Sequence, residues 1–288
     1  MNRRTLEWAA LAASLALLAS PALAYALGAW DPYWVAVTNL GDEPAYVALS
    51  ILLYTLVSHE LGFYALLSLM TSGWTNVLLK NALALPRPPR ELWKIEVSGY
   101  GFPSGHAQTS TSFWSSIALK LRDAYAAALG AVIVALVSYS RLELMVHYPH
   151  DVAGGILLGL ASTLAAFQMI RASEKWERWK QSLFLAAYGA AVSLLYLLHL
   201  DVVYARVGGV TIGLSAYPMV RQKIPEKPPL PAKAAAAVVA LLAALIITRA
   251  VSAAAPLVQL TGYALVAAVA VLAPLAGAPL SRGKTGRA

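Results

Sequence analysis

Long apolar stretches interrupted by short polar ones dominate the chain. A helix needs about 20 mostly apolar residues to cross a bilayer, with a usual range of about 17–25. Ten segments approach this length: 8–30, 45–57, 61–79, 106–119, 124–139, 152–170, 182–199, 202–220, 234–248 and 256–276. The second segment, 45–57, is the weakest of them. The pattern predicts an all-α fold, a polytopic transmembrane helical bundle.

The composition supports a membrane protein. Hydrophobic residues make up 59% of the 288 residues and charged residues 12%, whereas a soluble domain carries about 25% charged residues. These values exclude a disordered chain, a coiled coil and an ordinary cytosolic enzyme. The sequence contains no cysteine, so disulfides, thiolate metal sites and cysteine nucleophiles are excluded.

The basic residues indicate how the chain crosses the membrane. There are 22 Lys and Arg against 14 Asp and Glu, a net charge of +8. In a soluble protein this excess could indicate nucleic acid, but in an apolar chain it is typical of cytoplasmic loops. We therefore expect no nucleic-acid partner. With a cytoplasmic N-terminus and ten spans, 15 of the basic residues lie inside and 7 outside. This orientation depends on segment 45–57 being a true span.

The chain divides into two parts at a mixed-charge, aromatic stretch, 171–180. We predict a six-span core at 1–171 and a membrane extension of about four spans at 172–288. The Pro-rich stretch 224–231 reads as a stiff linker within the extension. Arg3-Arg4 and the apolar run behind them also resemble a signal peptide. Because the run continues to Trp30, we expect an uncleaved anchor.

A first polar cluster follows the third segment. Lys80 closes the segment, and Arg87 stands between Pro86 and Pro88, where the chain is stiff and cannot continue as a helix. Lys80 and Arg87 should therefore face the same aqueous side at the end of this segment. Snorkelling of both side chains at a helix end is the alternative for this cluster alone.

A second cluster, Pro103-Ser104-Gly105-His106, stands at the start of the fourth segment. Free N–H groups and the helix dipole favour an anion at such a position, and Gly105 allows the backbone to approach a ligand. A helix cap with a structural histidine is the alternative. The segment that follows is rich in Ser, Thr and Gln, so we expect it inside the bundle, where hydroxyl groups find partners.

A third cluster holds Ser140, Arg141, His147 and Asp151. On a helix, a spacing of four residues would put the carboxylate beside the imidazole, but Pro149 leaves the local conformation open. An aspartate at one ring nitrogen selects the tautomer and leaves the other nitrogen free to act.

Together the clusters resemble the signature of the type 2 phosphatidic acid phosphatase family, the lipid phosphate phosphatases. Lys80 to Pro88 match its motif Lys-x6-Arg-Pro, and Pro103 to His106 match Pro-Ser-Gly-His. Ser140 to Asp151 match Ser-Arg-x5-His-x3-Asp, with no departure at a motif position. The resemblance covers roughly residues 1–171 and leaves the later segments unexplained.

The resemblance implies a six-helix core and hydrolysis through a phosphohistidine, with no metal or other cofactor. It implies that His147 attacks phosphorus, that Asp151 orients His147, and that His106 protonates the leaving oxygen and then activates water. The groups that it implies for holding the phosphoryl oxygens are Lys80, Arg87, Ser104, Gly105 and Arg141. Fixed cations can compensate the charge of a phosphoryl group during transfer.

We therefore expect an integral-membrane phosphatase of the cell membrane, acting on a lipid phosphate or diphosphate at the extracytoplasmic face. Polyprenyl diphosphate, phosphatidate, phosphatidylglycerol phosphate and sphingoid phosphate all remain candidate substrates, and the oligomeric state stays open. The alternative is a lipid-phosphate binding or transport protein that uses the C-terminal spans. Vanadate-dependent halide oxidation, which a similar site supports in soluble relatives, fits a lipid-embedded chain poorly.

Overall fold

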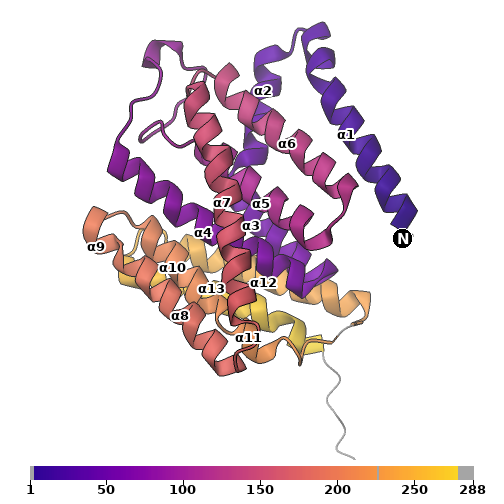
Figure 1. Cartoon of the computed structure of the whole chain (residues 1–288), viewed down its shortest axis with the longest axis vertical. Helices are drawn as coiled ribbons and strands as arrows, with labels where there is room; N and C mark the ends of the chain where they lie inside the picture. Colours follow the sequence, from indigo (N-terminus) through magenta and orange to yellow (C-terminus); the bar gives the residue numbers. More distant parts are fainter. Residues whose placement is uncertain (1–2, 226, 278–288) are drawn as a thin grey trace, which may run out of the picture.

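The computed structural model describes residues 3–225 and 227–277, and within them it is all helical, as predicted (Figure 1). The α-helices are α1 (Arg3–Ala26), α2 (Trp30–Thr38), α3 (Glu43–Leu52), α4 (His59–Leu83), α5 (Gly105–Leu121), α6 (Ala124–Glu143), α7 (Pro149–Ser173), α8 (Arg178–Leu194), α9 (Tyr196–His199), α10 (Val203–Leu214), α11 (Tyr217–Val220), α12 (Leu230–Val251) and α13 (Pro256–Leu272). Short 3₁₀ turns cover Asn39–Gly41, Arg90–Leu92 and Ala273–Gly277, and a π-helical turn covers Leu53–Val57.

Six helices of the described chain are long and apolar enough to cross a membrane, or seven if one bent pair counts as a span. They are Arg4–Ala26, Ala124–Glu143, Pro149–Ser173, Arg178–His199, Leu230–Val251 and Pro256–Ala276. The chain is therefore a polytopic helical membrane protein, with fewer full-length spans than the ten segments suggested. The polar helices α4 and α5 are not among the six.

Two expected spans do not form single full-length helices. Segment 45–57 belongs to the bent pair, in which Trp30–Gly41 and Glu43–Val57 meet at an angle of 54°. The bend falls at Asp42, whose extended backbone (φ −70°, ψ 134°) ends one helix and begins the next. Segment 202–220 divides into α10, of 12 residues, and the four-residue α11.

The centre of the bundle is α5, which packs against α4, α6 and α7. Helix α7 approaches it closely because two glycines face it. A Cβ at Gly155 would lie 2.6 Å from the Ser104 carbonyl oxygen, and one at Gly159 would lie 2.6 Å from that of Gln108. Small residues allow such close backbone contact between membrane helices.

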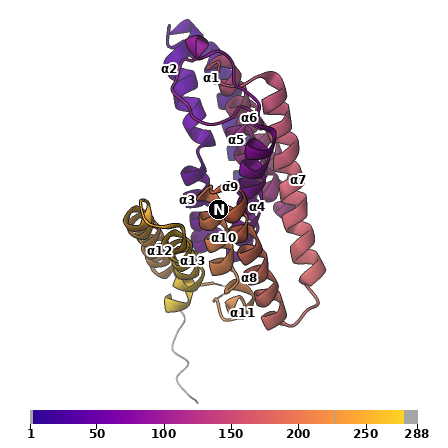
Figure 2. The ribbon, with the colours of Figure 1, turned by 90° about the vertical axis from the view of Figure 1, so that its left-hand side faces the viewer.

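The C-terminal helices dock on the core through α10, which packs on α4, and through α12, which packs on α3 (Figure 2). The short α10 lies between α8 and α13. Its glycines permit this: a Cβ at Gly209 or Gly213 would lie 2.3 Å from a carbonyl oxygen of α13. Most residues of α10 are buried, and a short helix is tolerated in a membrane protein where protein surrounds it.

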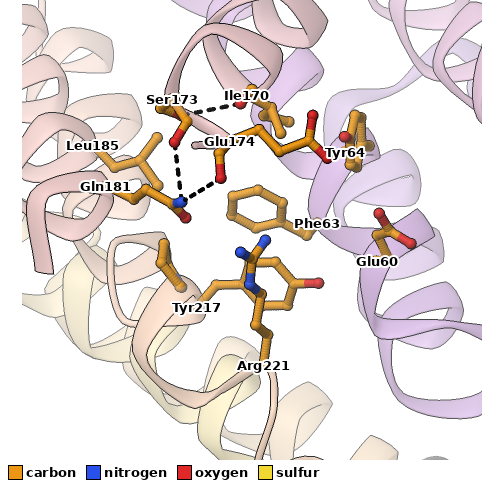
Figure 3. Close-up of a pocket in the computed structure, with 11 residues that line it drawn as sticks. Glu60, Phe63, Tyr64, Ile170, Ser173, Glu174, Gln181, Leu185, Tyr217 and Arg221 are labelled. Carbon is orange, nitrogen blue, oxygen red and sulfur yellow. Dashed lines mark hydrogen bonds between the residues drawn. The ribbon is translucent and has the colours of Figure 1, made fainter. Parts of the chain in front are cut away.

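One end of the bundle is joined by polar contacts away from the motifs. Lys120 Nζ lies 2.6 Å from Glu60 Oε1 and ties α5 to α4. Nearby, a cavity of about 50 Å³ lies between α4, α7, α8 and α11. There Gln181 of α8 donates to the carbonyl oxygens of Ser173 and Glu174, while Arg221 lies across the pocket (Figure 3). The pocket contains none of the motif residues.

Candidate active site

The three motifs meet at the end of the bundle opposite the pocket of Figure 3. Helix α4 ends at this end of the bundle, and α5 begins there. Helix α6 likewise ends there, and α7 begins there, because α4–α5 and α6–α7 run as two antiparallel pairs. Direct contacts join the motifs. Arg87 contacts His147, and the Ser104 N–H donates to the Asp151 carbonyl oxygen at 2.9 Å.

His147 and Asp151 form a buried pair. His147 Nδ1 lies 3.4 Å from Asp151 Oδ2, and the two residues are 4% and 0% exposed. His147 precedes α7 rather than lying on it, so helical spacing does not explain the contact. Asp151 instead sits in the first turn of α7, and its Oδ2 accepts the Tyr148 N–H at 2.9 Å. This helix-capping bond turns the carboxylate back toward the imidazole.

His150 is the other imidazole near Asp151. Its Nε2 lies 3.2 Å from Asp151 Oδ1, but its side chain is 62% exposed. Its ring stacks on Tyr148 at the surface.

The environment of His147 favours its neutral form. Burial lowers the pKa of His147 to about 4, and Arg87, Arg141 and Lys80 act in the same direction. The hydrogen bond to Asp151 opposes this shift. Near neutral pH the imidazole therefore keeps a lone pair, which nucleophilic chemistry requires.

Arg87 links the loop after α4 to His147. Its Nη1 lies 2.9 Å from His147 Nε2 and 2.9 Å from the Val146 carbonyl oxygen. Its Nε and Nη2 donate to the carbonyl oxygens of Gly99 and Ser98, both at 2.9 Å. Four contacts therefore hold this guanidinium in one orientation.

Lys80 lies in the last turn of α4 and donates to the Tyr100 carbonyl oxygen at 2.7 Å. Helix α4 ends just beyond it because Ala84 adopts a left-handed conformation (φ 47°). The prolines that follow prevent the helix from resuming. Lys80 and Arg87 thus hold neighbouring parts of one loop, residues 98–101.

Ser104 and Gly105 open helix α5. Ser104 is fully buried, and its Oγ has no hydrogen-bond partner within the described residues. A Cβ at Gly105 would make only ordinary contact with Asn76, at 3.6 Å, so packing does not require glycine there. An unpartnered hydroxyl beside a helix N-terminus suits an anion.

Arg141 is 2% exposed and lies in the last turn of α6. Its Nη1 donates to Thr38 Oγ1 at 2.5 Å. Its Nε has no partner within the part of the chain that the structure describes. Like Ser104, it offers a buried donor to a ligand with several acceptor oxygens.

Sequence reasoning missed a fourth segment of the site, at the bend between α2 and α3. Thr38 contacts Arg141, and Asp42 Oδ1 lies 3.0 Å from His106 Nε2. One feature of the sequence pointed to this segment: the acidic pair Asp42-Glu43 lies between two apolar segments. Charged groups at such places are costly without a partner.

The assembled site contains three cations, two imidazoles and two carboxylates. Lys80, Arg87 and Arg141 all lie close enough to His106 for electrostatic interaction. Within residues 3–225 and 227–277, no group of three or more His, Asp or Glu side chains is placed to hold a metal ion. Such a set can bind a phosphate ester through its cations and place a neutral imidazole beside it.

Comparison with known proteins agrees with this chemistry. Residues 61–175 match the model of the PAP2 superfamily. Mouse (Mus musculus) glucose-6-phosphatase 3 is 26% identical over 179 residues, 51% of this chain and 51% of that protein. Decaprenylphosphoryl-5-phosphoribose phosphatase of Mycobacterium tuberculosis is 37% identical over 86 residues, 29% of this chain and 46% of that protein.

The chain spans about half the length of the curated relatives it matches. No solved structure gives a significant match. The matched region contains Lys80, Arg87, His106, Arg141 and His147 and ends beyond Asp151. All three motifs therefore lie in the part of this chain, residues 61–175, that is similar to the PAP2 superfamily.

Proposed function

We propose that this protein is a membrane phosphatase that hydrolyses a lipid phosphate or diphosphate through a covalent phosphohistidine. The observation that carries the proposal is the position of His147. Asp151 lies at Nδ1 of its ring and Arg87 at Nε2. Asp151 therefore orients the ring through Nδ1, and Nε2 faces Arg87, which would hold the phosphate.

In the proposed reaction, His147 Nε2 forms a bond to phosphorus as the bond to the leaving oxygen breaks. His106 gives its proton to that oxygen and then removes one from the water that attacks the phosphohistidine. Lys80, Arg87 and Arg141, with Ser104 and the Gly105 N–H, compensate charge on the phosphoryl oxygens. Asp151 stabilises the positive charge that His147 gains.

A large apolar cavity supports a lipid as the substrate. It measures about 480 Å³ and lies between α3, α4, α10, α12 and α13. Its polar lining residues are Glu43, Arg206, Thr248 and Tyr263, and the others are apolar. Glu43 follows directly on Asp42, the partner of His106, so the cavity begins beside the site. We propose that a hydrocarbon chain occupies it.

Among lipid phosphates, a polyprenyl phosphate or diphosphate is our preferred substrate class. The mycobacterial relative is named for a decaprenyl-linked phosphate, and a mostly apolar cavity of about 480 Å³ suits a hydrocarbon chain. The count of basic residues supports a site on the extracytoplasmic face of the cell membrane, provided that the bent pair Trp30–Gly41 and Glu43–Val57 crosses the membrane as one span.

The decisive experiment is capture of the intermediate. Purified protein is mixed briefly with ³²P-labelled lipid phosphate and quenched in alkali, because phosphohistidine withstands alkali and decays in acid. We expect label on the wild type and on Glu96→Gln, a surface control, and none on His147→Asn. Binding of the lipid without phosphate release or labelled protein would favour the binding or transport alternative.

A further inference from the structure

The bend between α2 and α3 lies in close contact with His106. Asp42 Oδ1 lies 3.0 Å from His106 Nε2, and the Asp42 side chain is 48% exposed. A Cβ at Gly41 would lie 2.8 Å from His106 Cδ2 and 2.6 Å from Val137 Cγ1. Glycine is therefore required for the segment to come this close, and the contact fixes the plane of the imidazole.

The surroundings of His106 oppose a positive charge on its ring. Burial lowers the pKa of His106 most, and the charges of Arg141, Arg87 and Lys80, together with His147, act in the same direction. Cations near an imidazole disfavour its protonated form. A general acid must nevertheless hold a proton when it acts. A carboxylate in contact with the ring offsets this repulsion, and Asp42 supplies one.

We infer that Asp42 is the positioning residue of His106. It binds Nε2, so Nδ1 is the nitrogen that can donate to the leaving oxygen. The Nδ1 proton passes to that oxygen as the phosphorus–oxygen bond breaks and the bond to His147 Nε2 forms. The inference rests on the proposed function. It gives the site two Asp–His pairs, one for the nucleophile and one for the acid.

The test compares two leaving groups. p-Nitrophenolate departs readily without a proton, whereas an alkoxide needs one. For Asp42→Asn, we expect kcat/KM to fall roughly 10–100-fold on a short alkyl phosphate and less than about threefold on p-nitrophenyl phosphate, in line with the usual contribution of general acids. His106→Asn should give the same selectivity, and the double variant should be no worse than His106→Asn alone.

Asp42→Glu keeps the carboxylate and should recover part of the lost rate on the alkyl phosphate. Asp31→Asn is the matched control, because Asp31 pairs with Lys94 at the surface, at 2.6 Å. Unchanged rates in Asp42→Asn would overturn the inference, because Asp42 would then have no role in the reaction. Equal losses of rate on both substrates would also overturn it, because they would indicate a structural role only. If the wild type hydrolyses neither these esters nor a lipid phosphate, the proposed function itself fails.

Discussion

Nη1 of Arg87 lies 2.9 Å from Nε2 of His147. Arginine has only donors, so Nε2 is the acceptor in this contact, and the ring hydrogen resides on Nδ1, toward Asp151. The tautomer that a nucleophilic Nε2 requires is therefore set before a substrate arrives. During phosphoryl transfer the same guanidinium can exchange its contact with Nε2 for one with a phosphoryl oxygen.

The first prediction concerns the titration of His147. Its pKa lies near 4, below the usual 6.5 for histidine, so the ring should be neutral at pH 6 and gain a proton only as the pH falls through about 4. Arg87→Gln removes one neighbouring cation and should raise this pKa. ¹⁵N NMR of histidine-labelled protein in detergent measures both effects.

The chain has five histidines, and loss of one signal in His147→Asn identifies the relevant one. In the wild type, Nδ1 should be the protonated nitrogen. A pKa at or above 6.5, or a hydrogen on Nε2, would contradict the arrangement described here.

The second prediction is that chelation of divalent metals leaves phosphatase activity intact. Lys80, Arg87 and Arg141 supply fixed positive charge where phosphoryl oxygens would lie. Removing one such group should cost roughly 10²–10³ in kcat, so Arg141→Gln should be severely impaired in either EDTA or Mg²⁺. Loss of wild-type activity in EDTA, with recovery on adding Mg²⁺, would refute a cation-only site.

The third prediction tests the apolar cavity. Val210 and Ala244 line it, so Val210→Trp and Ala244→Trp should fill part of its volume. We expect KM for a long-chain lipid phosphate to rise severalfold, because the displaced chain can still lie in the surrounding lipid. A short, water-soluble phosphate ester should be hydrolysed at the wild-type rate.

The matched control is Ile246→Trp, also on α12, at a side chain that is 63% exposed and does not line the cavity. It should leave both substrates unaffected. If all three variants changed KM for the lipid equally, or if the cavity variants lost activity on the short ester, the cavity would not be the site that binds the lipid chain.

The fourth prediction concerns the face of the membrane. The native chain lacks cysteine, so single cysteines report cleanly on exposure. Glu96→Cys, in the exposed loop beside the site, should react with an impermeant maleimide in intact cells, and Lys175→Cys, between α7 and α8, should react only after lysis. Ser173 would be a poor choice because it is buried. The reverse labelling would place the reaction in the cytoplasm.

Much of the site could be predicted from local sequence. The order of helices and loops places Lys80, His106, Arg141 and His147 at one end, whatever the direction of insertion. The link between His147 and Asp151 was also predictable, although its cause was not. A spacing of four residues suggested a shared helix face, while the structure forms the contact by capping α7 with Asp151.

The rest depended on contacts between distant segments. Thr38 and Arg141 are 103 residues apart, and no local pattern pairs them. Hydropathy likewise counted 202–220 as one span, because it does not register that α8 and α13 enclose α10. The acidic pair Asp42-Glu43 between segments 8–30 and 45–57 was a local signal of the break, but its contact with His106 on a distant segment was not predictable from it.

The bend at Asp42 changes what a minimal version of this protein must contain. Trimming the chain to residues 61–175 would retain every signature residue from Lys80 to Asp151. It would also delete the hydroxyl that holds Arg141 and the carboxylate beside His106. A truncated variant designed on motif boundaries would thus carry a complete signature and an incomplete site, so any transplantable catalytic unit has to begin upstream of α2.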